Sequence, residues 1–204
     1  MTWRALSGQC ACRRCCHYHF GMSQHWPPTA RTITLGGGCF WCTEAIFSRV
    51  RGVLHVESGY CNGHVQHPTY ERVCQGDTGH AEVVQVVYDS SVIALRDVLQ
   101  IFFATHDPTT LNRQGHDVGT QYRSGIYFRD EAEREVAHAV RDQVNQALDG
   151  QVVTEIQALS QYHRAEDYHQ AYFANHPGQG YCVAVIAPKV YGFEQHFRKW
   201  LIDA

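Results

Sequence analysis

The order of apolar segments along the chain constrains its fold more than any other feature of the sequence. Segments rich in β-branched residues alternate with segments whose apolar residues recur at a helical spacing, and several predicted strands are separated by loops alone. This mixed order predicts an α+β fold, a two-layer sandwich in which helices pack on a mixed β-sheet. The expected strands are 32–35, 53–59, 81–88, 121–128, 152–158 and 182–186, and the expected helices are 39–50, 93–105, 130–148, 165–174 and 192–201.

The composition of the chain excludes several classes of function. With 204 residues the chain is expected to form one domain that buries its own core. Charged residues make up 18% and the net charge is −3, which argues against a binder of nucleic acid. A hydrophobic content of 44% argues against disorder, and no apolar run approaches the roughly 18 residues of a membrane span. We therefore expect no nucleic-acid or membrane partners. We also expect a monomer.

The first 30 residues differ from the rest and hold four of the nine cysteines. They contain no apolar stretch of the roughly 7–15 residues found in a secretory signal, which favours the cytoplasm, where thiols stay free. One interpretation is a zinc-binding interaction protein, because cysteine and histidine are zinc ligands. The other is a disordered extension at 1–30, in which Met22 offers a second start for the chain, with one domain at 31–204. The cluster comprises Cys10, Cys12, Cys15, Cys16, His17, His19 and His25.

A predicted strand, three glycines and a cysteine that opens a helix make Cys39 a candidate nucleophile. Gly36, Gly37 and Gly38 allow a sharp turn and leave space for a ligand. The free N–H groups and the dipole at a helix N-terminus stabilise a thiolate, so we expect a lowered pKa at Cys39. An inert buried cysteine would not need these glycines.

Cys39 and Cys42 also form a C-x-x-C pair, which places two sulfurs on one face at the start of a helix. A dithiol–disulfide oxidoreductase is therefore an alternative function. The intervening Phe40 and Trp41 are bulky, and they could either wall a small apolar pocket beside the sulfur or pack in the core.

Several long motifs resemble the peptide methionine sulfoxide reductase A family. The resemblance runs in order over about residues 31–190 and does not include residues 1–30. The motifs are Gly-Gly-Cys-Phe-Trp-Cys-Thr-Glu-Ala at 37–45, Ser-Gly-Tyr at 58–60, Pro-Thr-Tyr-Glu-Arg-Val-Cys at 68–74, Gly-Asp-Thr-Gly-His-Ala-Glu-Val-Val at 76–84, 102–115, Asp-Val-Gly-Thr-Gln-Tyr-Arg-Ser at 117–124, Ala-Glu-Asp-Tyr-His-Gln at 165–170 and Val-Ile-Ala-Pro-Lys at 185–189.

The resemblance implies a ferredoxin-like core, a catalytic domain at 31–204 and no bound cofactor or metal. It implies reduction of methionine-S-sulfoxide, free or in oxidised proteins, which repairs oxidative damage. The nucleophile of the family matches Cys39, which would become a sulfenic acid. Phe40 and Trp41 match the aromatic residues that hold the methyl group of the substrate.

The acid of the reaction should be a carboxyl that keeps a proton in an apolar site. The resemblance assigns this role to Glu82, whose position before the apolar strand residues Val83 and Val84 is unusual for a charged side chain. It assigns Tyr70 and Tyr122 as hydroxyl donors to the sulfoxide oxygen, and a phenol donates a hydrogen bond without carrying charge. Asp117 matches a residue that orients the substrate and a water molecule.

The step that regenerates Cys39 is where the sequence departs from many relatives. Their C-terminal tail carries recycling cysteines, whereas this chain ends without one, and Cys182 falls in a predicted buried strand. A sulfenic acid condenses with a nearby thiol, so Cys42, Cys61 and Cys74 are the candidate resolving residues. An external thiol, from thioredoxin, glutaredoxin or glutathione, would complete the cycle.

Overall fold

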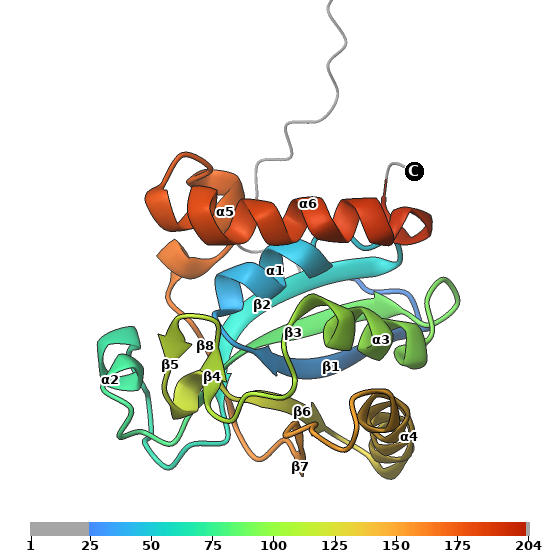
Figure 1. The fold of residues 1–204 in the computed structure, drawn as a ribbon, viewed down its shortest axis with the longest axis horizontal. Helices are drawn as coiled ribbons and strands as arrows, with labels where there is room; N and C mark the ends of the chain where they lie inside the picture. The colour runs from blue at the N-terminus through green and yellow to red at the C-terminus, as the bar shows by residue number, and fades with distance from the viewer. Residues whose placement is uncertain (1–24, 203–204) are drawn as a thin grey trace, which may run out of the picture.

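A computed structural model describes residues 25–202 of the chain, which form a layer of helices against a twisted sheet (Figure 1). The strands are β1 (Ala30–Gly37), β2 (Val53–Cys61), β3 (Ala81–Asp89), β4 (Arg113–Gln114), β5 (Asp117–Val118), β6 (Ser124–Phe128), β7 (Glu155–Ala158) and β8 (Tyr162–Arg164). The α-helices are α1 (Phe40–Phe47), α2 (Tyr70–Cys74), α3 (Leu95–Thr105), α4 (Glu131–Ala147), α5 (Tyr172–Asn175) and α6 (Ala187–His196). Short 3-10 turns lie at 120–122, 167–169 and 198–200.

The main sheet of the described residues has the strand order β7-β6-β1-β3-β2-β8. Its neighbours pair antiparallel except β6 and β7, which are parallel, so the sheet is mixed. The strands β4 and β5 form a separate small hairpin. The α+β architecture with a mixed sheet, expected from the order of segments, is therefore confirmed.

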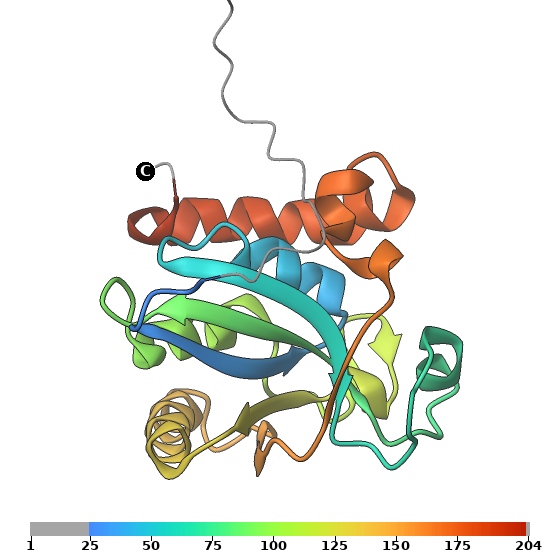
Figure 2. The ribbon, with the colours of Figure 1, turned by 180° about the vertical axis from the view of Figure 1, so that it is seen from behind.

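The two faces of the sheet are covered differently, and this decides which side chains reach α1. The large core cluster joins α1 and α3 to one face and includes Leu35, Tyr60 and Val84. A small cluster of Cys61, Ala81, Val83 and Tyr127 lies on the other face. Seen from behind in Figure 2, the strands β1, β2 and β3 lie in front of α1 and α3. Because side chains alternate along a strand, Glu82 shares the α1 face with Tyr60 and Val84.

The segment 182–186 is the clearest error of the sequence-based expectations, since it is helical rather than a strand. Its β-branched residues favour a strand by propensity, but buried residues recur at 182, 186, 190 and 193, which is a helical spacing. The turn at Cys182–Ile186 continues directly into α6, so the last helix begins near 187 rather than 192.

Several other elements have boundaries that differ from the expected ones, because local turns shorten or divide them. The expected helix 165–174 is divided, because Ala171 adopts a left-handed backbone (φ 51°) between a 3-10 turn and α5. The strands expected at 121–128 and 152–158 begin at 124 and 155. The expected loops contain short elements, namely α2 within 60–79 and the β4–β5 hairpin within 106–120, and β8 was not expected. The strand at 81–88 and the helices at 93–105 and 130–148 agree closely with β3, α3 and α4.

Within residues 25–202, no helix is both long and apolar enough to cross a membrane. The cysteines of this range, Cys39, Cys42, Cys61, Cys74 and Cys182, are all free thiols.

Candidate active site

Cys39 lies where β1 turns into α1, as the N-cap residue of the helix. The turn needs glycine at position 38, because Gly38 has φ +88° and a Cβ there would come within 2.5 Å of Gln114. Gln114 is itself held by two 3.0 Å hydrogen bonds with the backbone of Asp107. The glycine turn expected from the sequence therefore places the Cys39 sulfur at the end of the sheet, with 8% of the residue exposed.

Cys42, one helical turn along α1, lies against Cys39 and forms a hydrogen bond with it. It is 3% exposed, so both sulfurs are almost completely buried. The side chain of Tyr181 hydrogen-bonds both sulfurs, and its hydroxyl donates to Asp117 Oδ2 at 2.7 Å. The C-x-x-C spacing thus brings the two thiols together as expected, and Asp117 reaches them through a tyrosine.

The pKa of Cys39 does not shift in the direction expected from a helix N-terminus. Burial raises it, and the hydrogen bond with Cys42 and the charge of Glu82 raise it further. The pKa of Cys42 is instead lowered by its hydrogen bond with Cys39, with contributions from Lys189 and Tyr181. Of the two sulfurs in the substrate-free site, Cys42 therefore loses its proton more readily than Cys39.

Glu82 is buried in β3, directly beside the start of α1. The backbone N–H of Phe40 donates to its Oε2 at 3.1 Å, while Oε1 has no hydrogen-bond partner among residues 25–202. Burial raises the pKa of Glu82 to about 8, and the charge of Asp117 also raises it. A carboxyl that is 1% exposed and still protonated at neutral pH is suited to donate a proton.

Aromatic rings surround the start of α1. Tyr172 stacks on Trp41 with ring centroids 3.8 Å apart, and Tyr70 lies 6.4 Å from both Trp41 and Phe40. The indole N–H of Trp41 donates to Nδ1 of His169 at 3.1 Å, so this imidazole is neutral with its proton on Nε2. Phe40 and Trp41 therefore belong to an aromatic wall beside the sulfurs.

Tyr70 and Tyr122 come from α2 and from the 3-10 turn at 120–122. Burial raises the pKa of both hydroxyls, and the charge of Glu82 raises it further, which places both phenols near the carboxyl. Glu166 fixes the start of α2, because its Oε1 accepts the Tyr70 N–H at 3.0 Å while its Oε2 accepts the Tyr60 hydroxyl at 2.9 Å.

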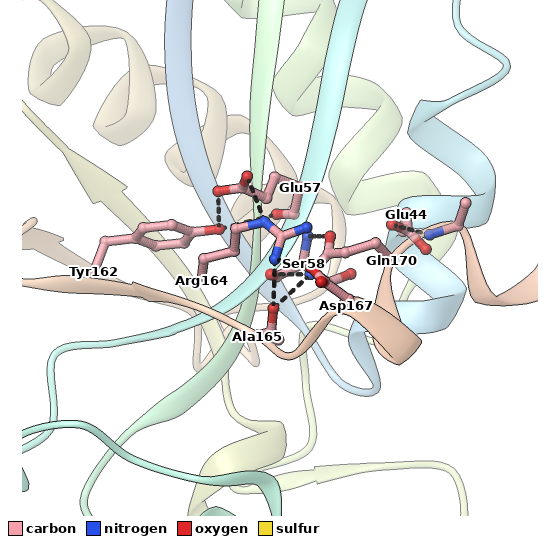
Figure 3. Close-up of polar contacts among 9 residues, drawn as sticks. Glu44, Glu57, Ser58, Tyr162, Arg164, Ala165, Asp167 and Gln170 are labelled. Carbon is pink, nitrogen blue, oxygen red and sulfur yellow. Dashed lines mark hydrogen bonds and ion pairs between the residues drawn. The ribbon is translucent and has the colours of Figure 1, made fainter. Parts of the chain in front are cut away.

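The segment that carries His169 and Tyr172 is tied to β2 and α1 by polar contacts (Figure 3). Gln170 exchanges two hydrogen bonds with the backbone of Ser58, at 2.9 and 3.0 Å, and Arg164 pairs with Glu57 at 3.1 Å. The carboxylate of Glu44, on α1, accepts the N–H groups of Ala171 and Tyr172 at 2.8 and 3.2 Å. These contacts hold the ring of Tyr172 over Trp41.

The remaining cysteines occupy different places. Cys61 is fully buried in the small cluster on the far face of the sheet, away from α1. Cys74 is exposed on α2, where it hydrogen-bonds Tyr70. Cys182 is buried beside Tyr181. His80, in the motif at 76–84, has a structural role, because its ring hydrogen-bonds the backbone of Gly63 and Val65.

Sequence reasoning missed four residues of this site, namely Tyr181, Tyr172, His169 and Glu44. His169 lies in the motif at 165–170, and Tyr172 and Tyr181 lie between that motif and the next one at 185–189. Glu44 lies in the first motif, but no spacing rule connects the segment 169–181 with Cys39. Their positions depend on the left-handed turn at Ala171 and on the helical start at 182, neither of which was expected.

No group of three or more metal-binding side chains occurs in the part of the chain that the structure describes. The N-terminal cysteine and histidine cluster extends from 10 to 25, and its members at 10–19 lie outside the described residues, which include only His25 of the cluster.

Comparison with known proteins decides the family. The sequence model described as peptide methionine sulfoxide reductase matches residues 31–201. The chain belongs to this family. A peptide methionine sulfoxide reductase MsrA of Saccharolobus solfataricus is 53% identical over 164 residues, which cover 80% of this chain and 93% of that protein. A peptide methionine sulfoxide reductase MsrA of Chromobacterium violaceum is also 53% identical, over 80% of this chain and 94% of that protein.

Solved structures of the family have the same fold. The reduced form of Mxr1 from Saccharomyces cerevisiae superposes with a TM-score of 0.72 at 36% identity, covering 78% of this chain and 92% of that one. Methionine sulfoxide reductase A of Corynebacterium diphtheriae gives 0.67 at 36% identity, covering 74% and 77%. Membership of the family does not favour the alternative of a dithiol–disulfide oxidoreductase.

Proposed function

We propose that this chain reduces methionine-S-sulfoxide, free or in oxidised proteins, to methionine. One observation carries the proposal: a buried cysteine thiol and a buried, protonated carboxyl meet at one end of the sheet, beside an aromatic wall. Family membership supports the same reaction, since the relatives carry that activity in their names. Reduction of methionine sulfoxide repairs oxidative damage to proteins.

In the first half-reaction, the Cys39 sulfur attacks the sulfoxide sulfur and takes over its oxygen. Glu82 donates a proton to the sulfoxide oxygen through Oε1, its unpartnered atom. The products are a Cys39 sulfenic acid, which keeps the proton from Glu82 on its oxygen, and methionine, while the thiol proton lost by Cys39 returns to the Glu82 carboxylate. The cysteine sulfur is thus oxidised by two electrons as the substrate sulfur is reduced by two. A protonated sulfoxide carries positive charge beside the thiol, which counteracts the raised pKa of Cys39.

The remaining site residues position the substrate. Tyr70 and Tyr122 lie near Glu82 and donate hydrogen bonds to the sulfoxide oxygen. Phe40 and Trp41 hold the methyl group, with Trp41 fixed by His169 and Tyr172. Asp117 orients the substrate and a water molecule, and its Oδ2 also accepts the Tyr181 hydroxyl at 2.7 Å.

Cys42 is the resolving residue in this proposal. It hydrogen-bonds Cys39 and has a lowered pKa, whereas Cys61 lies on the other face of the sheet. Cys74 is exposed beside Tyr70 and is the second candidate. Thioredoxin is the reductant that we propose for the resulting disulfide, because Mxr1 forms a complex with Trx2 and superposes on this chain with a TM-score of 0.52 at 25% identity. Glutaredoxin and glutathione are the alternative reductants.

We also propose that the central strands form a ferredoxin-like core. The elements β1-α1-β2-β3-α3-β6 follow the order strand-helix-strand-strand-helix-strand, and their strands pair as β6-β1-β3-β2 with all neighbours antiparallel. A catalytic domain at 31–204 agrees with the family match at 31–201. The cytoplasmic location and the monomeric state stay predictions.

A turnover assay tests the proposed function. The two sulfoxide epimers of an N-acetylated methionine sulfoxide amide are supplied separately, with dithiothreitol as reductant, to the wild type and to Cys39→Ser and Cys61→Ser. We expect turnover of the S epimer by the wild type and by Cys61→Ser, and none by Cys39→Ser. Turnover by Cys39→Ser, or turnover confined to the R epimer, would contradict the proposal.

A further inference from the structure

The hydroxyl of Tyr181 occupies a position that the reduction of the sulfoxide does not require. Its side chain hydrogen-bonds the sulfur of Cys39 and the sulfur of Cys42, and the same hydroxyl donates to Asp117 Oδ2 at 2.7 Å. One oxygen atom therefore connects both thiols with a carboxylate of the β4–β5 hairpin.

Tyr181 is held in this position from several sides. It begins the helical turn that leads into α6, and that turn packs on α1 through the buried residues Cys182 and Ile186. The edge of its ring contacts Trp41, with centroids 5.9 Å apart and planes at 71°. The hydroxyl is thus placed by its own helix, by α1 and by β5, and a tyrosine with so many fixed neighbours orients what it bonds.

We propose that Tyr181 is the positioning residue for the resolving step, holding the Cys42 sulfur in line with the oxidised Cys39. The inference rests on the proposed function, in which Cys42 resolves the sulfenic acid. In that step the thiol of Cys42 attacks the sulfur of the Cys39 sulfenic acid. An S–S bond forms, the S–O bond breaks, and the departing hydroxide takes up the proton lost by Cys42 and leaves as water.

A cysteine on a helix has several staggered χ1 positions, and one of them directs its sulfur toward residue i−3. A hydroxyl that bonds both sulfurs favours this position over the others. Asp117 keeps the hydroxyl in place, because its Oδ2 accepts a hydrogen bond from the hydroxyl at 2.7 Å.

The experiment follows one turnover without reductant. Wild type and Tyr181→Phe are mixed with one equivalent of N-acetyl-methionine-S-sulfoxide amide, and samples are quenched over time. Methionine formation is measured by chromatography, and the Cys39–Cys42 disulfide by peptide mass spectrometry. A parallel sample contains dimedone, which traps a sulfenic acid before it is resolved. Phenylalanine keeps the ring beside Trp41, so the variant removes the hydroxyl alone.

The expected result is a separation of the two steps. In Tyr181→Phe the disulfide should form at least about tenfold more slowly, which corresponds to about 1.4 kcal/mol, while methionine formation slows much less. Dimedone should then label Cys39 in the variant and scarcely at all in the wild type. The matched control is Tyr191→Phe, an exposed tyrosine on α6, which should behave as the wild type.

A combined variant separates positioning from a general effect on the structure. In a Cys42→Ser background the resolving sulfur is absent, so adding Tyr181→Phe should not lengthen the lifetime of the sulfenic acid further. A further lengthening there would show that Tyr181 acts through the structure of the site and would overturn the proposal. Equal rates of disulfide formation in Tyr181→Phe and the wild type would overturn it as well.

Failure of this inference is distinguishable from failure of the proposed function. If the wild type forms no methionine, the proposed function is wrong. If it forms methionine but joins Cys39 to a thiol other than Cys42, the reduction stands and the inference about Tyr181 is overturned.

Discussion

At the scale of single residues, the site depends on a carboxyl that the protein keeps protonated. Glu82 lies between Ala81 and Val83 in a strand rich in valine, and its Oε2 accepts the N–H of Phe40. Its pKa of about 8 follows from burial, so the acid is neutral at pH 7 and yet lies beside a thiol. A general acid of this kind typically contributes a factor of 10² to 10⁴ to a rate.

Replacing Glu82 with glutamine should therefore slow methionine formation by about 100-fold or more, because the amide keeps the shape of the side chain and cannot donate a proton to a leaving oxygen. The measurement is the single-turnover rate with one equivalent of methionine-S-sulfoxide at neutral pH. Glu135→Gln, at an exposed position of α4, is the control and should not change the rate. A decrease of less than about threefold in Glu82→Gln would show that Glu82 is not the acid.

The site residues that could be predicted from the sequence are those marked by an unusual local pattern. Cys39 follows three glycines and opens a helix, and Glu82 interrupts an apolar strand. Tyr181 carries no such signal, because a tyrosine after Gly180 is equally typical of a loop. The pKa of Cys39 was expected to fall, and it rises because burial and the charge of Glu82 act on the thiol, effects that appear only in three dimensions.

At the scale of elements, α1 holds the aromatic wall through one buried carboxylate. Glu44 receives two backbone N–H groups at the start of α5, and this places Tyr172 on Trp41. The left-handed turn at Ala171 (φ 51°) directs both N–H groups toward α1. The wall is thus assembled by two elements that are more than 120 residues apart in the chain.

Glu44→Ala should destabilise the protein by about 2–4 kcal/mol, since it leaves two N–H groups without their charged acceptor. It should also raise KM for a methionine sulfoxide peptide, because Tyr172 is no longer held on Trp41. Urea unfolding and steady-state kinetics measure the two effects. Glu135→Ala is the matched control, and an unchanged unfolding midpoint in Glu44→Ala would contradict the structural role.

The helix at 182–196 shows why some elements could not be predicted from the sequence. Val183, Val185 and Ile186 favour a strand locally. The segment is instead a helix, because it lies on α1 and not at an edge of the sheet, and packing overrides propensity. By contrast, α4 was predicted closely, since Asp130 caps its N-terminus and its apolar residues recur at a helical spacing.

At the scale of the whole molecule, the buried carboxyl links stability to pH. The pKa of Glu82 is about 8 in the folded chain and near 4.5 when the chain is unfolded, so the folded state binds this proton more tightly. The contribution of this bound proton on Glu82 to the free energy of unfolding is fully present below about pH 4.5 and is lost as the pH rises through about 8. Glu44, with a pKa of about 6, acts in the same direction over a narrower range.

The difference in stability between Glu82→Gln and the wild type should therefore change with pH. Between about pH 4.5 and pH 8.5, the free energy of unfolding of the variant should rise relative to that of the wild type by about 5 kcal/mol at most. The reason is that glutamine does not titrate. Urea unfolding curves at several pH values measure this difference. A difference that stays constant over the range would show that Glu82 titrates normally.

The central claim is that the sulfur of Cys39 takes the oxygen from methionine sulfoxide. The most direct measurement is the yield of methionine from enzyme without any reductant, for the wild type, Cys39→Ser and Cys42→Ser. The account predicts about one methionine per chain from the wild type and from Cys42→Ser, and none from Cys39→Ser, since the oxygen must first reside on Cys39. Methionine formed by Cys39→Ser in amounts comparable with the wild type would contradict it.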